Sequence, residues 1–187
     1  ALMSRGLGDV YKRQCWNSGI ETNILALVGK IILSIERKFR SPRAESYFAW
    51  KLTFDAWGNK ISSKRTNFDW LSNDTFQVDK YIQDKLCGFD ISLQSWLEVA
   101  EAVFYSSRNL SMIPSNFPIC LVGGEQDPCT NYGKDMRKLA ARLKRMGHVN
   151  FSHETIRGCR HETLNEINRE HYVGIFLDWL QDQTKRN

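Results

Sequence analysis

Long apolar runs are missing from this sequence of 187 residues, although hydrophobic residues make up 42% of it. A membrane-spanning helix needs about 20 consecutive apolar residues, and the best candidate, 24–35, is interrupted by Lys30. Residues 1–14 also lack the apolar core of a secretory signal. The hydrophobic content is instead enough for one ordinary globular core.

The cysteines are neither paired nor closely spaced. Five of them stand at positions 15, 87, 120, 129 and 159, an odd number without a CxxC pair, which argues against both a disulfide framework and a zinc site. No HxxxH or HExxH spacing indicates a metal, and Gly123-Gly124 is not followed by the GK[ST] of a phosphate-binding loop. The sequence therefore predicts no metal, no nucleotide and a reducing, cytoplasmic setting.

Residues 1–14 (ALMSRGLGDVYKRQ) are unusual for a protein N-terminus. The block 9–14 (DVYKRQ) matches the translation of a transposon sequencing adapter, so we interpret 1–14 as a disordered artefact and expect an upstream part of the gene to be missing. Without these residues, which include three basic and one acidic side chain, the net charge falls from +5 to +3. So small a charge, without a clustered basic face, does not indicate a nucleic-acid partner.

The segment 114–187 has the pattern of an α/β protein. Ile119–Val122 is a continuous apolar run that ends at glycines, which is typical of a strand buried on both faces. A helix capped by Asn131 and closed by Gly147 follows, then a second strand at 149–156 and a final helix. This order predicts parallel pairing and the α/β fold class. The apolar side of the final helix is expected to comprise Ile167, Val173, Phe176, Leu177 and Leu180.

The segment 15–113 has the pattern of helices and loops. Its first helix is predicted by an apolar stripe at helical spacing, formed by Ile24, Val28, Ile31, Ile35 and Phe39. Further helices are expected at 74–84, with Ser72 or Asn73 as the cap, and after a cap at Ser92. Such an aromatic-rich helical block is typical of a packed core and also of an active-site lid for an apolar substrate.

Two candidate catalytic residues follow the two predicted strands. Asp127 comes after the first strand and His161 after the second, with one helix and one strand between them. Alone, an aspartate before Pro128 is more often a turn residue, and a loop histidine is more often a surface residue. Because parallel sheets keep their chemistry beyond the carboxyl ends of their strands, the joint placement predicts the acid and the base of a nucleophile–His–Asp relay. The other three histidines are interpreted as structural.

Seven short segments carry a resemblance to a known family. In chain order they are 66–72 (TNFDWLS), 78–81 (VDKY), 86–89 (LCGF), 124–128 (GEQDP), 131–134 (NYGK), 158–162 (GCRHE) and 164–166 (LNE). Their order and spacing make residues 16–184 similar to the C-terminal part of α/β-hydrolases of the serine aminopeptidase, monoacylglycerol lipase and lysophospholipase type.

The resemblance implies a partial α/β-hydrolase fold. Residues 15–113 would be a helical cap, and 114–187 would be the last two parallel strands with their helices. Asp127 and His161 would complete a catalytic triad whose serine lies upstream, since no G-x-S-x-G occurs in the chain. This fragment alone is therefore expected to be inactive.

The implied reaction is the cleavage of carboxyl esters in lipid-like substrates of the monoacylglycerol or lysophospholipid type, without a cofactor. Phe68, Trp70 and Phe89 are expected to line the substrate site, and the cap to contact a membrane surface transiently. Two alternatives stay open. An amidase or aminopeptidase of the same fold would need an amine-binding carboxylate, for which Asp69 and Asp74 are candidates. A non-catalytic α/β protein would keep the acid and the histidine only as vestiges.

Overall fold

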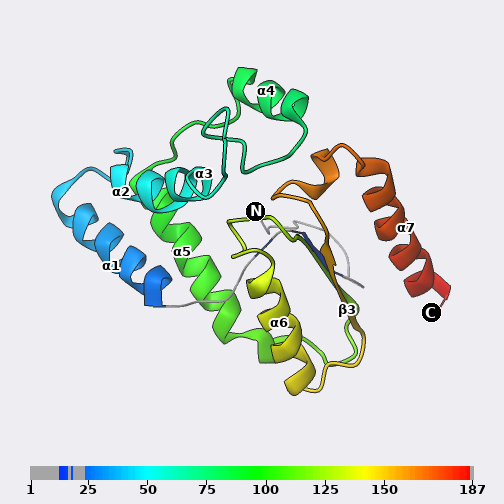
Figure 1. The fold of residues 1–187 in the computed structure, drawn as a ribbon. Helices are drawn as coiled ribbons and strands as arrows, with labels where there is room; N and C mark the ends of the chain where they lie inside the picture. The colour runs from blue at the N-terminus through cyan, green and yellow to red at the C-terminus, as the bar shows by residue number, and fades with distance from the viewer. Residues whose placement is uncertain (1–12, 17, 19–23, 186–187) are drawn as a thin grey trace.

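The computed structural model describes residues 13–16, 18 and 24–185 (Figure 1). One sheet contains three parallel strands in the order β1 (Arg13–Trp16), β2 (Ile119–Gly124) and β3 (Phe151–Ile156). The longer helices are α1 (Ile24–Phe39), α4 (Thr75–Gln83), α5 (Leu93–Arg108), α6 (Lys134–Arg145) and α7 (Arg169–Lys185). Shorter helical pieces are α2 (Tyr47–Trp50), η1 (Lys51–Asp55), α3 (Ala56–Gly58), η2 (Leu110–Met112) and η3 (Thr163–Asn165).

The sheet has three strands, whereas the sequence predicted two. β1 pairs in parallel with β2, with Arg13 opposite Ile119 and Trp16 opposite Val122. Arg13 and Gln14, which we assigned to the adapter-like segment, lie in this strand, and 1–12 lie outside the described residues. A strand of four residues held by backbone hydrogen bonds needs no apolar run, which is the pattern that predicts β2.

The central strand β2 is buried on both faces, as its apolar run predicts, and all six of its residues are buried. On one face, Ile119 and Leu121 pack against Met136, Leu139 and Leu143 of α6. On the other face, Cys120 and Val122 pack with Tyr172 of α7. Figure 1 shows these two helices flanking the sheet. The alternation of side chains along a strand thus divides the core into two layers.

The last helix buries a different face from the one expected. Tyr172, Ile175 and Trp179 pack against the sheet, whereas Ile167, Val173 and Leu177 are 69%, 39% and 46% exposed. Apolar residues surround this helix, so their spacing alone does not distinguish one face from the other. The contact of Tyr172 with Cys159 and Ile156 shows which face packs on the sheet.

The helices α1 to α5 lie between β1 and β2 in the chain. Leu33 of α1 and Leu93 of α5 are buried together, with Ala49, and Lys30 forms an ion pair with Glu101. Ser92 caps α5 as predicted, since its hydroxyl accepts from the backbone N–H of Ser95. The cap of α4 is Asp74, one or two residues later than predicted.

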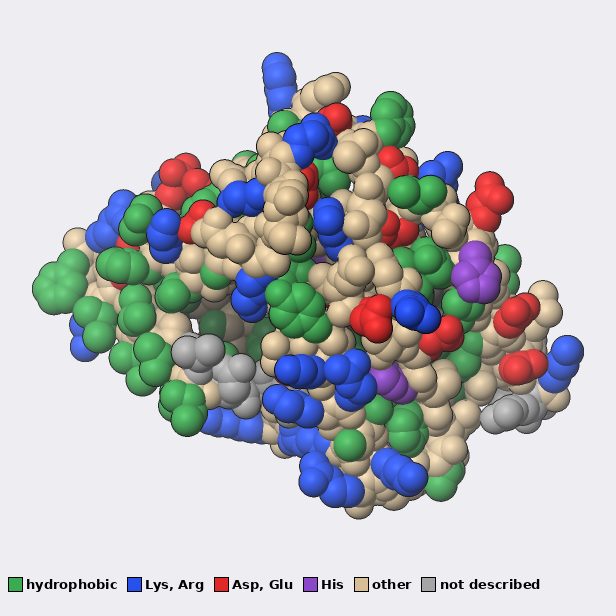
Figure 2. Space-filling view, in the orientation of Figure 1, with side chains coloured by type: hydrophobic (Ala, Val, Ile, Leu, Met, Phe, Trp, Pro, Cys, Tyr) green, Lys and Arg blue, Asp and Glu red, His purple; other side chains and the backbone are tan. Residues whose placement is uncertain are grey.

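The apolar stripe of α1 is exposed rather than buried. Its five residues and the neighbouring Leu27 are 44% to 83% exposed: Ile24, Leu27, Val28, Ile31, Ile35 and Phe39. Figure 2 shows hydrophobic side chains gathered over this helix, at the left of the view. In the described part of the chain, no helix combines the length and the apolarity that crossing a membrane requires.

Candidate active site

The aspartate of the predicted pair lies in the turn that follows β2. Asp127 is fully buried, and its carboxylate accepts three hydrogen bonds: 2.8 Å from the backbone N–H of Cys129, 2.8 Å from the Thr130 hydroxyl and 3.0 Å from His161 Nδ1. A carboxylate offers about four acceptor positions, so three of them are occupied. These donors hold the carboxylate in one orientation.

The turn continues into α6 through an unusual backbone. Asn131, Tyr132 and Gly133 have φ values of 53°, 58° and 70°, which lie in the left-handed region. Gly133 is the residue before the helix, so the prediction that Asn131 caps it is wrong. The strained turn brings Tyr132 N to within 2.7 Å of the backbone oxygen of Asp127, which closes the loop around the acid.

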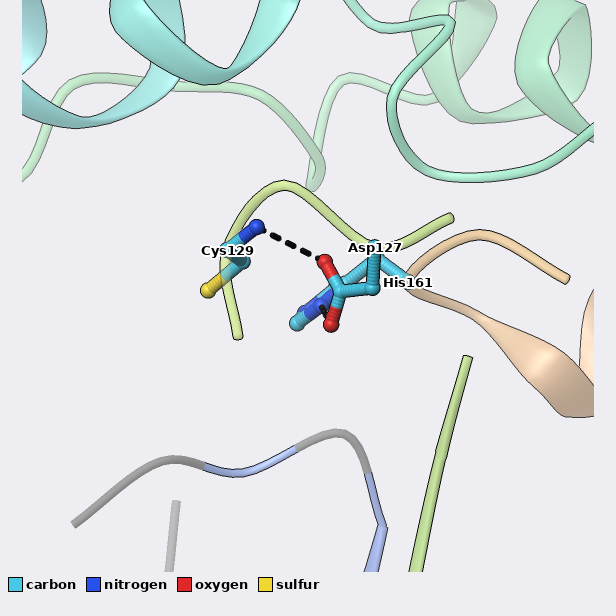
Figure 3. Close-up of side chains that lie close together, drawn as sticks. All are labelled: Asp127, Cys129 and His161. Atoms are coloured by element: carbon cyan, nitrogen blue, oxygen red, sulfur yellow. Dashed lines mark hydrogen bonds and ion pairs between the residues drawn. The ribbon is translucent and has the colours of Figure 1, made fainter. Parts of the chain in front are cut away.

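The histidine of the pair lies in the loop that follows β3. Its Nδ1 is 3.0 Å from Asp127 Oδ2, and its side chain is 24% exposed. In the neutral ring with the proton on Nδ1, this nitrogen donates to Asp127 and leaves Nε2 free to accept a proton. Among the described residues, none hydrogen-bonds to Nε2. The structure thus brings together the two residues that the sequence predicts to act together (Figure 3).

One glycine allows the two loops to meet. A Cβ built on Gly124, the last residue of β2, would lie 2.1 Å from the backbone oxygen of Arg160 and 2.4 Å from that of Cys159. Real Cβ atoms do not come so close to backbone oxygens. The histidine loop therefore lies directly on the end of β2, where any side chain would push it away.

A segment about ninety residues earlier in the chain holds the histidine loop from the other side. The backbone N–H of His161 donates to the Trp70 carbonyl at 3.3 Å, and that of Glu162 donates to the Leu71 carbonyl at 2.7 Å. The indole of Trp70 also packs on the imidazole, with ring centroids 5.1 Å apart. The position of His161 thus depends on the loop 66–73 as well as on the sheet.

Two charged residues that we did not predict strengthen this junction. The buried carboxylate of Glu166 accepts from Arg160 N at 2.7 Å and from Asn73 N at 3.1 Å. The Arg160 guanidinium donates to the carbonyls of Asp69 and Ser72 at 2.6 and 3.1 Å. Both residues belong to short segments that resemble the family, which was the one signal that could have identified them.

The three predicted substrate residues are placed differently. Trp70 is 3% exposed and packs on the ring of His161. Phe68 is half-buried and packs on Trp50 and Tyr81, with centroids 6.1 and 5.3 Å apart. Phe89 is 60% exposed, and no aromatic ring among the described residues contacts it. The structure therefore brings one of the three directly to the site.

Trp70 connects the site to a larger group of rings, which we term the aromatic cluster: Trp50, Phe54, Trp57, Phe68, Trp70 and Trp96. Phe54 is central, since it contacts four of the others with centroid distances of 5.1 to 5.9 Å. Offset and edge-to-face pairs of this kind are each worth about 0.5–1.5 kcal/mol beyond burial. The cluster therefore ties α2, η1, α3 and α5 to the wall of the site.

A cysteine stands beside the pair (Figure 3). Ligand atoms of Asp127, Cys129 and His161 all lie within 4.8 Å of one another. Burial raises the pKa of the Cys129 thiol, and the negative charge of Asp127 raises it further. The thiol is therefore protonated at neutral pH, and among the described residues these three side chains form the one group suited to hold a metal ion.

Known proteins resemble this chain in family and in fold. A family model described as serine aminopeptidase, S33, matches residues 23–168. A thermostable carboxyl esterase from Bacillus coagulans, solved with glycerol, has a TM-score of 0.79 at 17% identity over 95% of this chain and 56% of that chain. A lipase in an open form has a TM-score of 0.76 at 20% identity over 91% of this chain and 56% of that chain.

A soluble variant of monoglyceride lipase from Saccharomyces cerevisiae, solved with a substrate analog, has a TM-score of 0.63 at 15% identity over 93% of this chain and 54% of that chain. No curated protein matches the chain significantly. At these identities the solved structures show a shared fold, and the chain spans little more than half of their length, 54% to 56%.

Proposed function

Because the chain belongs to the serine aminopeptidase (S33) family and has part of the α/β-hydrolase fold, we propose that it carries the acid and the base of a serine hydrolase. The substrates are carboxyl esters of lipid-like molecules, of the monoacylglycerol or lysophospholipid type. The nucleophilic serine belongs to a part of the protein outside these residues, since the chain contains no G-x-S-x-G. No cofactor takes part in the proposed reaction.

One observation supports the catalytic roles above all others, namely the 3.0 Å contact between His161 Nδ1 and Asp127 Oδ2. Asp127 holds the imidazole in the tautomer that leaves Nε2 free as an acceptor, and its charge stabilises the imidazolium when it forms. His161 takes the proton from the attacking serine and returns it to the leaving alkoxide. The acyl-enzyme is then released by water in the same manner.

The helices between β1 and β2 form the cap in this proposal. The aromatic cluster supplies an apolar wall that reaches the imidazole through Trp70, which suits an acyl chain. Phe68 lies in the same cluster, with its ring centroid 6.1 Å from that of Trp50. Phe89 is exposed in the loop between α4 and α5. The similar folds of known esterases and lipases and the aromatic cluster together support an ester substrate with an apolar acyl group.

Transient contact with a lipid surface is a further part of the proposal. The exposed stripe of α1 is apolar, and the last turn of the same helix carries Arg37 and Lys38. A helix with one apolar face and neighbouring cations is suited to the interface of an anionic bilayer. Ile31→Asp should weaken sedimentation with vesicles that contain phosphatidylserine, whereas Thr75→Asp on exposed α4 should not. Equal binding of both variants would contradict this part of the proposal.

The aminopeptidase alternative requires a free carboxylate near the pair, and both candidates are engaged elsewhere. Asp69 accepts from the Arg65 backbone N–H and from the Thr66 hydroxyl. Asp74 caps α4 by accepting from Phe76 N at 3.0 Å. Neither carboxylate is available to bind a substrate amine without breaking local structure, which favours the ester over the amide.

The experiment begins with the upstream coding sequence, joined to this chain to express the complete enzyme. Turnover of medium-chain p-nitrophenyl esters and monoacylglycerol is compared with turnover of aminoacyl anilides. His161→Ala should lower kcat by about 10⁴-fold or more, and Asp127→Asn should lie within one or two decades of that loss. His153→Ala, on the face of β3, is the matched control and should keep kcat.

Three outcomes would contradict the proposal. An upstream region without a nucleophile elbow would indicate the non-catalytic alternative. Faster cleavage of anilides than of esters would indicate the aminopeptidase. Loss of activity in His153→Ala, with activity kept in His161→Ala, would show that the wrong histidine was assigned.

A further inference from the structure

Three different metal-binding side chains meet at one point of the structure. Asp127 and Cys129 come from the turn after β2, and His161 comes from the loop after β3. Figure 3 shows the sulfur of Cys129 on the same side of the carboxylate as the imidazole. The sequence predicted no metal site, because the spacing patterns that indicate one place their ligands close together in the chain, whereas this set becomes compact only on folding.

We propose that Asp127, Cys129 and His161 form a binding site for a thiophilic divalent cation, Zn²⁺, that inhibits the enzyme. Thiolate, imidazole and carboxylate are the three ligand types that Zn²⁺ uses in proteins. Binding of the cation does not depend on the proposed function, whereas the inhibition does, because it assumes that His161 is the base.

The distances need only a small adjustment to reach zinc geometry. Zinc–ligand lengths of about 2.0 Å to nitrogen or oxygen and 2.3 Å to sulfur place tetrahedral ligands about 3.3–3.6 Å apart. His161 Nδ1 and Asp127 Oδ2 are 3.0 Å apart, and the widest separation in the set is at most 4.8 Å. Moving the sulfur inward by about 1 Å, within the range of a small χ1 rotation, closes the site.

The carboxylate of Asp127 can bind a cation and still accept the hydrogen bonds from Cys129 N and Thr130 Oγ1 that orient it. Asp127 keeps one acceptor position after its three hydrogen bonds, and the bonds from Cys129 N and Thr130 Oγ1 remain when the cation enters. Such hydrogen bonds orient a metal-binding carboxylate. The side chain of His161 is 24% exposed, so water can reach the site and would supply the fourth ligand of a tetrahedral cation.

Charge and protons balance in this reaction. The Cys129 thiol loses its proton to solvent as the Zn–S bond forms. The proton on His161 Nδ1 leaves for Nε2 through solvent as Nδ1 binds the metal, so the neutral ring keeps one proton. The dication then neutralises two anions, the thiolate and the Asp127 carboxylate, and one proton is released for each ion bound.

Inhibition follows from the tautomer. The base must accept the serine proton at Nε2, which requires the ring proton to be on Nδ1. With Nδ1 bound to the metal, Nε2 carries the proton and has no lone pair to offer. The same cation also replaces the Nδ1–Asp127 hydrogen bond that orients the ring.

Binding is tested on the full 187-residue chain with Cd²⁺ as the probe, because a cadmium–thiolate bond has an ultraviolet charge-transfer band. One equivalent should bind, and urea that unfolds the chain should abolish the band. Cys129→Ser should weaken binding by more than about 100-fold, since losing even an outer partner of a metal ligand costs 10–100-fold. His161→Ala should weaken it by at least about 10-fold.

Cys87→Ser is the matched control, because Cys87 is also a free, half-buried cysteine, and burial together with the charge of Asp84 raises the pKa of its thiol. This variant should bind Cd²⁺ as the parent chain does. A band that survives in Cys129→Ser, that disappears in Cys87→Ser or that is unchanged in His161→Ala would overturn the proposal. Circular dichroism of each variant shows that the fold is kept, and Cys129→Ala serves as a second test of the same ligand.

The inhibitory consequence is tested separately in the complete enzyme. Zn²⁺ should reduce ester turnover, and Cys129→Ser should raise the inhibitory concentration by about 100-fold relative to its own uninhibited rate. Cadmium binding in an enzyme without esterase activity would support the proposed metal site and contradict the proposed esterase function. Esterase activity that Zn²⁺ inhibits equally in the parent enzyme and in Cys129→Ser would support the proposed function and contradict the proposed metal site.

Discussion

Replacing Gly124 by alanine should damage the fold at the point where the loops that carry Asp127 and His161 meet. The new Cβ would stand 2.1 Å from the Arg160 oxygen, and ordinary contact begins at 3.4 Å. The histidine loop must therefore retreat by about 1 Å or the end of β2 must bend. Neither movement is free, because Gln126 N donates to the Cys159 oxygen at 2.8 Å and Glu125 N donates to the Ile156 oxygen at 2.9 Å.

The size of the effect follows from these contacts. Overpacking in a rigid interior costs about 1–3 kcal/mol, and more where the neighbour cannot move. Here the neighbours are backbone atoms, so we expect Gly124→Ala to lower the free energy of unfolding by about 3 kcal/mol. In the complete enzyme, displacement of the imidazole by about 1 Å should lower kcat by about 100-fold.

The control is a glycine-to-alanine substitution at a position where the added methyl group has room. A Cβ on Gly174 in α7 would meet nothing within 4 Å, and Gly→Ala inside a helix stabilises by about 0.5–1 kcal/mol. Urea unfolding followed by tryptophan fluorescence should therefore show opposite shifts for the two variants. If Gly124→Ala unfolds within 0.5 kcal/mol of the parent, roughly the scatter of surface substitutions, the close approach of the loops is wrong.

Three further predictions concern the chain as it stands. The 187-residue chain should show no p-nitrophenyl ester turnover above buffer, because it contains no G-x-S-x-G and the proposed acid and base alone offer no acyl-enzyme route. Turnover that disappears in His161→Ala would contradict this. Burial alone would raise the pKa of Asp69, but hydrogen bonds from Thr66 and Arg65 outweigh it and hold the pKa below the ordinary 3.8. Its contribution is therefore present above pH 3.8 and is lost as the pH falls through the depressed value, and Asp69→Asn should lower stability at pH 7 by about 1–3 kcal/mol, as urea titration can measure. Burial, aided by the charge of Arg137, lowers the pKa of His153 from 6.5, so stability should fall as the pH drops below 6.5 toward the lowered value; His153→Gln should remove that slope, and an unchanged slope would contradict the assignment.

The features of the fold that could be predicted are those for which a local sequence pattern is compatible with only one local structure. The apolar run of β2 predicts a strand covered on both faces, and both faces are covered. Because Asp127 and His161 each follow a predicted strand, the sequence alone places them in loops at the ends of neighbouring strands. Gly147 after α6 has φ of 82°, as a residue that closes a helix should.

The parts that were not predictable depend on partners far away in the chain. Periodicity shows that α1 is a helix, but not that its stripe faces solvent, since the period is the same for either environment. A buried glutamate such as Glu166 looks like a surface residue until the backbone of Asn73 is known to lie against it. Cys129 likewise joins the imidazole only through folding.

The backbone bonds from His161 and Glu162 to Trp70 and Leu71 have a consequence for protein engineering. Exchanging the whole of 24–113 with a relative would remove the carbonyls that hold the His161 loop. A chimera should instead keep 66–73 with its own C-terminal half and place its crossovers before Arg65 and after Asp74. Grafts made at those boundaries would alter the helices of 24–113 and keep the His161–Asp127 contact of 3.0 Å.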